Sequence, residues 1–229
     1  LLFLAAIVSA FWYLRLEEMD REHEAVRRDV EYAQQRVRLR LLERQEQLMR
    51  VAHDISNQEM GRDEFVSRVE AMVIQYPELQ AVAWIDERRR IRASYAAPSV
   101  AASQLRPSGS VLRGDETESI YTLARDVQQP VYSQPAAGAD GSGLLQLHIP
   151  LANQQGKFAG VVLGEYSIDA LLRYAVPAEV SAKYAVALLD GKNRILAGSS
   201  VPPRKGPTQL LPWAAEPNEY EVPVSPVGN

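Results

Sequence analysis

Apolar side chains dominate the first 14 residues, LLFLAAIVSAFWYL, in which Ser9 is the one polar side chain and no residue is charged. A helix of this length covers about 21 Å, whereas a bilayer core is about 30 Å thick. Trp12 and Tyr13 stand at the end of the run, as interfacial aromatic residues do. We therefore interpret residues 1–14 as the end of a transmembrane helix. The alternatives are a signal peptide, with a cleavage site at residues 8–10, and a buried helix.

Residues 15–57 contain neither proline nor glycine and are rich in good helix formers. Apolar residues recur three or four positions apart, which predicts a long coiled-coil-like helix. The step from Val37 to Leu41 is one residue too long for the heptad, and Gln45 occupies one apolar position. A helix of this kind needs a partner, which is either a second subunit or a globular body lying along it.

A repeated hairpin follows a second predicted helix at residues 62–75. Residues 81–94 (AVAWIDERRRIRAS) and residues 185–198 (AVALLDGKNRILAG) are identical at seven of fourteen positions. Each copy reads as a strand, a polar turn that begins with aspartate, and a second strand. An internal repeat of this kind indicates two related modules.

Three more strands are expected between the two copies, at residues 131–133, 144–151 and 158–166, and a helix at residues 168–174. The stretch 95–130 has no clear period. The order of elements predicts the α+β class: a long N-terminal helix, then an antiparallel sheet of about five strands with flanking helices.

Composition excludes several classes of function. The chain has 229 residues, a formal net charge of −4, no cysteine and three histidines that lie far apart. Nucleic acid is therefore not an expected partner, and disulfides and cysteine-ligated metals are excluded. No nucleotide-binding or hydrolase motif is present, so we expect no catalytic site, no metal and no cofactor in these residues. Leu1 is not methionine, so we expect a cut N-terminus.

Candidate ligand contacts come from one face of the predicted sheet and from the variable stretch. Glu165 lies in an otherwise apolar strand, and a buried carboxylate must be paired or neutralised. Its partner is expected to be an arginine, such as Arg92 or Arg125, or a ligand amine. The candidate binding residues are Trp84, Arg92, Tyr121, Arg125, Tyr132, His148 and Glu165. A core role is the alternative for Trp84 and Tyr132.

Residues 77–91, 144–172 and 184–197 together resemble the extracytoplasmic sensor regions of bacterial transmembrane receptors. These are the PAS-like domains grouped as Cache or PDC, and the related CHASE domains. The resemblance implies a membrane-distal PAS-like sensor module at residues 58–181. It also implies a partial membrane-proximal PAS-like module at residues 182–229.

The resemblance further implies a function. The expected role is to bind a small molecule in the periplasm and to signal through a homodimer formed by the long helix. The anchor would lie in the bacterial inner membrane, and the cytoplasmic output would be the histidine kinase of a two-component system. The alternative is a ligand-free dimerisation or protein-interaction module of a diguanylate cyclase or chemoreceptor.

Overall fold

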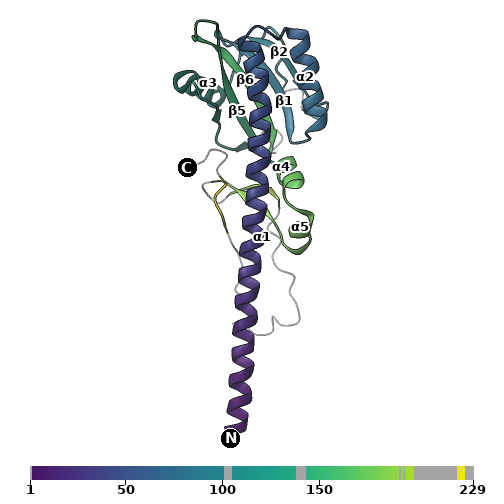
Figure 1. Ribbon diagram of the computed structural model, residues 1–229, viewed down its shortest axis with the longest axis vertical. Helices are drawn as coiled ribbons and strands as arrows, with labels where there is room; N and C mark the ends of the chain where they lie inside the picture. Colours follow the sequence, from purple (N-terminus) through teal and green to yellow (C-terminus); the bar gives the residue numbers. More distant parts are fainter. Residues whose placement is uncertain are drawn as a thin grey trace.

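The protein is an α+β fold in which one very long helix lies across an antiparallel sheet (Figure 1). This computed structural model describes residues 2–100, 105–137, 143–190, 192, 194–198 and 221–224, with the backbone alone for 2–20, 22, 115 and 137. The helices are α1 (Leu2–Ser56), α2 (Arg62–Gln75), α3 (Asp115–Val127), α4 (Ile168–Ala175) and α5 (Ala178–Lys183). The fold class predicted from the sequence is confirmed.

The main sheet is antiparallel throughout, with the order β2-β1-β6-β5-β3 and a further short strand, β4, paired with β5. Its strands are β1 (Leu79–Asp86), β2 (Ile91–Ala96), β3 (Val131–Tyr132), β4 (Ala136–Ala137), β5 (Gly143–Ala152) and β6 (Phe158–Ser167). Successive residues of a strand point to opposite faces of the sheet, so each strand contributes side chains to both faces. One face, which we call the helix face, packs against α1 and α2; the other, the pocket face, is partly covered by α3.

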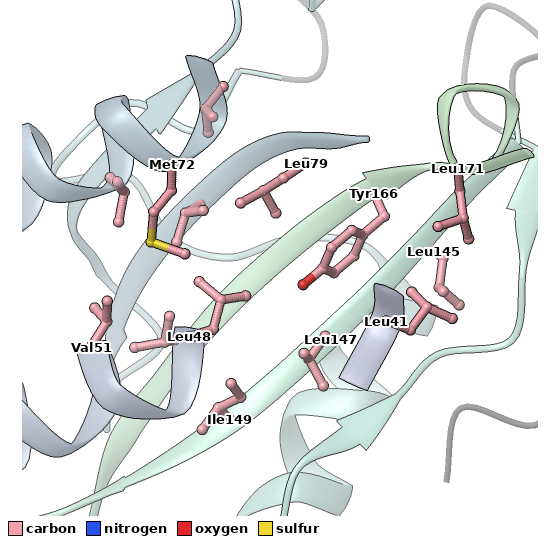
Figure 2. Packing of buried hydrophobic residues seen from close by; sticks show 14 of the residues in the cluster. Leu41, Leu48, Val51, Met72, Leu79, Leu145, Leu147, Ile149, Tyr166 and Leu171 are labelled. Carbon is pink, nitrogen blue, oxygen red and sulfur yellow. The ribbon is translucent and has the colours of Figure 1, made fainter. Parts of the chain in front are cut away.

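The predicted apolar stripe of α1 packs on the helix face of the chain's own sheet (Figure 2). The globular body of the same chain therefore covers the stripe. It is one of the two partners expected for this helix, the other being a second subunit. The buried positions follow an 11-residue repeat, which fits a nearly straight helix better than a heptad does. This repeat explains the long step from Val37 to Leu41. The residues of the repeat are Ala33, Val37, Leu41, Arg44, Leu48, Ala52 and Ile55; Val51, which is also fully buried, lies beside them.

A buried ion cluster joins α1 to the start of β1. The carboxylate of Glu78 is fully buried and accepts hydrogen bonds from Arg40 Nε at 2.7 Å and from Arg44 Nε at 3.1 Å. Burial alone would raise the pKa of Glu78, but the bonds from both arginines and from its own backbone outweigh burial and lower the pKa. Arg44 also lies 3.5 Å from the ring centre of Tyr76, and Arg40 donates to the carbonyl of Tyr174 at the end of α4.

The two copies of the repeat form hairpins with the same register. β7 (Ala187–Leu189) and β8 (Ile195–Gly198) pair Leu188 with Ala197, as β1 and β2 pair Trp84 with Ala93. Both hairpins shift register directly after this pair, and in both the leading aspartate of the turn accepts two backbone N–H bonds. The half-identical sequences therefore encode the same turn geometry.

Two helices, α3 and α5, were not predicted. The stretch 95–130, which has no clear sequence period, contains α3 on the pocket face, with Tyr121 and Ala124 buried. Tyr121 and Ala124 lie on the side of α3 that meets the sheet, whereas Leu123 and Val127 are exposed, so the apolar residues of this helix are not confined to its buried side.

α1 runs without interruption from Leu2, so the N-terminal apolar run and the sheet-packed part belong to one helix. In the part of the chain that the structure describes, no helix offers an apolar stretch long enough to cross a membrane.

Gly164 on β6 tests the packing of α1 on the helix face. A Cβ at this position would lie 2.7 Å from Leu48 Cδ1, and Leu48 is fully buried. We expect Gly164→Ala to lower the free energy of unfolding by about 1–3 kcal/mol through overpacking, measured by urea denaturation. Gly61→Ala is the control, because a Cβ there meets nothing within 4 Å. Equal stabilities of the two variants would contradict the close contact between helix and sheet.

Candidate ligand-binding site

A cavity of about 890 Å³ opens on the pocket face, between the sheet and the segment 105–114. Its floor includes Ala81 on β1 and Glu165 on β6, which are paired across the two central strands. The side chain of Ala81 is a single methyl group, so a larger side chain at this position would fill part of the cavity. The volume is within the range of small-molecule sites.

Segment 105–114 is held along the edge of β2 by main-chain hydrogen bonds. Gly109 N donates to Ile91 O at 2.7 Å, and Ile91 N donates to Ser110 O at 2.8 Å. Ser108 Oγ donates to the carbonyl of Arg92 at 2.8 Å, and Ser94 Oγ donates to the carbonyl of Arg106. These bonds fix the backbone that carries Arg106 into the cavity.

Three polar side chains meet at one end of the cavity. Arg106 Nη2 lies 2.6 Å from Glu165 Oε1, and Arg106 Nε lies 3.3 Å from Glu165 Oε2. Gln146 Nε2, on the neighbouring strand β5, donates to the same Glu165 Oε1 at 2.8 Å. Glu165 is only 5% exposed, so this network satisfies a buried carboxylate. Its arginine is Arg106, and not Arg92 or Arg125 as the sequence suggested.

His148 continues the polar line of β5 beyond Gln146 and is fully buried. Its Nε2 lies 3.5 Å from Gln146 Oε1, and its Nδ1 has no hydrogen-bond partner among the described residues. Burial, with a smaller contribution from the charge of Arg106, lowers the pKa of His148 to about 3. The imidazole is therefore neutral at physiological pH.

The remaining predicted residues lie outside this cavity. Trp84 is on the helix face, with its ring centre 5.9 Å from that of Phe65. Tyr121 is buried against Phe158 and donates to the carbonyl of Asp86 at 2.7 Å; burial raises its pKa to about 12. The structure thus places Glu165 in the cavity and His148 beside it.

The other three predicted residues are spread over the molecule. Arg92 lies 3.9 Å from the carboxylate of Asp86, and Arg125 pairs with its neighbour Asp126 on the exposed side of α3. Tyr132 lines a second hollow of about 950 Å³ between α1, α4 and the β7–β8 hairpin, where most lining side chains are apolar.

Arg106 and Gln146 were not among the site residues predicted from the sequence. The sequence pointed to Arg106 only indirectly, because Glu165 needed a positively charged partner that the sequence did not identify. Within the described part of the chain, no three acidic or histidine side chains lie close enough to hold a metal ion.

Solved structures with the same fold include extracellular sensor domains. The extracellular domain of soHK1S-Z6, a protein assigned to the histidine kinases, is 15% identical, with a TM-score of 0.55 and coverage of 80% of this chain and 72% of that chain. The ligand-binding domain of the Campylobacter jejuni chemoreceptor Tlp3, in complex with L-valine, is 12% identical, with a TM-score of 0.54 and coverage of 80% and 73%.

A longer extracellular ligand binding receptor from Desulfohalobium retbaense is 18% identical, with a TM-score of 0.46 over 65% of this chain; the match spans only 27% of that receptor. No protein-family model matches the sequence, and no curated protein shows significant similarity to it. At these identities the likeness establishes the fold alone. The chain has the Cache-like fold of the extracellular sensor domains of histidine kinases and chemoreceptors, as the sequence resemblance predicted.

The buried neutral His148 predicts a pH-dependent stability. Its pKa is near 6.5 when unfolded and about 3 when folded, so the unfolded state binds the extra proton between these values. The contribution of His148 to the free energy of unfolding is largest above about pH 6.5 and falls as the pH decreases towards 3. Between pH 6.5 and 5 the loss should be about 2 kcal/mol.

Urea denaturation at the two pH values measures this loss. His148→Gln should remove most of it, whereas His53→Gln, at an exposed histidine on α1, should not. An unchanged pH dependence in His148→Gln would show that another group causes it.

Proposed function

We propose that this chain is the extracytoplasmic, small-molecule-sensing region of a bacterial membrane receptor. Its ligand binds in the cavity on the pocket face, and a homodimer formed through α1 carries the signal to a cytoplasmic output. That output is the histidine kinase of a two-component system. The sensor lies in the periplasm, and residues 1–14 anchor it in the inner membrane.

The observation that carries this proposal is the cavity, where Arg106, Gln146 and Glu165 meet beneath a hydrogen-bonded loop. A recess with a few convergent polar groups is the usual form of a small-molecule site. The Tlp3 domain, which shares the fold, is described with L-valine bound. A sensing role also accounts for the long helix on the opposite face of the same sheet.

The dimer is proposed on a second apolar stripe of α1, which faces away from the sheet. Tyr32, Leu39, Leu42 and Met49 are exposed and fall at heptad spacing, as the a and d positions of a coiled coil do. Tyr32 and Leu39 are a positions, and Leu42 and Met49 are d positions. This stripe is separate from the 11-residue repeat that packs on the sheet.

Charges beside the stripe favour a parallel dimer in register. The g positions Glu31 and Arg38 would face Arg36 and Glu43, respectively, at the e positions of the partner subunit. Both pairs are oppositely charged, and such g-to-e pairs set partner choice and orientation in coiled coils. A parallel arrangement brings both N-termini to the same side, as a shared membrane requires.

The chain is proposed to divide into an anchor (1–14), a coiled-coil helix (15–57), a distal sensor module (58–181) and the start of a proximal module (182–229). The matching registers of the two hairpins support the proximal module as a second PAS-like unit.

Thermal-shift screening of amino acids, organic acids and amines against the full chain tests sensing. A ligand at about 100 times its Kd should stabilise the protein by about 2.7 kcal/mol. Ala81→Phe should fill the cavity and remove the shift, whereas Arg125→Gln, on the exposed side of α3, should keep it. If no compound raises Tm, or if Ala81→Phe responds like the wild type, the cavity is not a sensing site.

Light scattering of the full chain tests the dimer. The double variant Leu39→Glu/Leu42→Glu would bury four carboxylates in the dimer, and we expect its dissociation constant to rise by about 100-fold or more. Ile74→Glu, at an exposed apolar residue of α2, is the control and should leave the mass unchanged. A dimer that persists in the double variant would place the interface elsewhere.

A further inference from the structure

We infer that the cavity selects a small carboxylate with a single negative charge, which binds to Arg106 and Arg113. This inference rests on the proposed sensing function and gives it a ligand class. It also assigns Glu165 a different role from the ligand-amine contact considered from the sequence: Glu165 is the buried counter-ion of Arg106 and limits the positive charge that the ligand meets.

Glu165 has little capacity left for a ligand cation. Its Oε1 already accepts bonds from Arg106 at 2.6 Å and from Gln146 at 2.8 Å, and its Oε2 faces Arg106 Nε. A ligand amine would have to displace a guanidinium from a carboxylate that is only 5% exposed. Breaking a buried, hydrogen-bonded pair of this kind is costly.

Arg106 has donors to spare. A guanidinium carries five N–H groups in a fixed plane, and Glu165 engages it through Nε and Nη2. Nη1 makes no hydrogen bond among the described residues, and the side chain, at 19% exposed, lines the cavity. A planar donor with free N–H groups is suited to a carboxylate.

The charge of the lining also favours an anion. Among the described lining residues the charged side chains are Arg106, Arg113 and Glu165, which leaves one net positive charge. Thr117, Ser110 and Gln146 add neutral polar groups. At the start of α3, Glu118 pairs with Arg89, so its charge is already compensated outside the cavity lining. A lining with one net positive charge favours a monocarboxylate over a phosphate ester, which carries more negative charge.

Glu165→Gln separates the two ligand classes by the sign of its effect. With a neutral amide in place of the carboxylate, the charge of Arg106 is no longer compensated, and the net charge of the lining rises to two. We expect affinity for a carboxylate to increase about threefold to tenfold. A site that binds an amine through Glu165 would instead lose its affinity.

Isothermal titration of the full chain should use acetate, lactate, pyruvate and benzoate as carboxylates, glycerol phosphate as the phosphate ester, and butylamine and putrescine as amines. At least one carboxylate should bind, more weakly at high salt and about tenfold more weakly to Arg113→Gln. Arg113 is exposed, so this variant tests the inference without disturbing the core. Arg125→Gln should bind like the wild type.

Four outcomes would overturn the inference. Tight binding of an amine that Glu165→Gln abolishes, or a preference for glycerol phosphate, would reject the carboxylate class while leaving the sensing function intact. Carboxylate binding that is indifferent to both Glu165→Gln and Arg113→Gln would place the carboxylate outside this cavity. Absence of binding by every compound here and in the wider thermal-shift screen would reject the sensing function itself.

Discussion

The position of α1 depends on a buried carboxylate. Glu78 is fully buried, and without Arg40 and Arg44 it would be an unpaired charge in the core. Removing one partner of a buried ion pair typically costs about 3–5 kcal/mol. The apolar stripe of α1 permits packing on the sheet, but the two arginines define which turn of the helix lies beside β1. The same cluster reaches α4 through the bond from Arg40 to the carbonyl of Tyr174.

β6 connects this cluster to the cavity. Glu165 projects to the pocket face, whereas its neighbour Tyr166 is fully buried beneath α1 (Figure 2). The next residue, Ser167, donates its N–H to the carbonyl of Glu78 at 2.9 Å and caps α4. Three consecutive residues therefore touch the candidate ligand site, the long helix and the helix that leads to the second hairpin. A shift of Glu165 on ligand binding would therefore reach α1 through the adjacent Tyr166.

The sequence predicted those parts of the fold in which apolar residues recur at a regular spacing. The long helix, the hairpins and the central strands follow from regular apolar spacing, and the structure has them. The stripe on α1 could not reveal whether a second subunit or the sheet covers it. Glu78 gave no signal, because its partners lie 34 and 38 residues away along the chain. Arg106 was missed for a similar reason: it lies in a loop without periodicity, and only the folded chain brings it to Glu165.

Hydrogen exchange of the full chain, with and without the tightest-binding carboxylate, measures whether the cavity and α1 are coupled. We expect slower exchange in segment 105–114 and around Gln146 and Glu165, together with altered exchange in α1 across the sheet. Protection confined to the exposed loop, with no change in α1, would contradict the proposed link between the cavity and the helix. Protection elsewhere in the molecule would contradict the site itself.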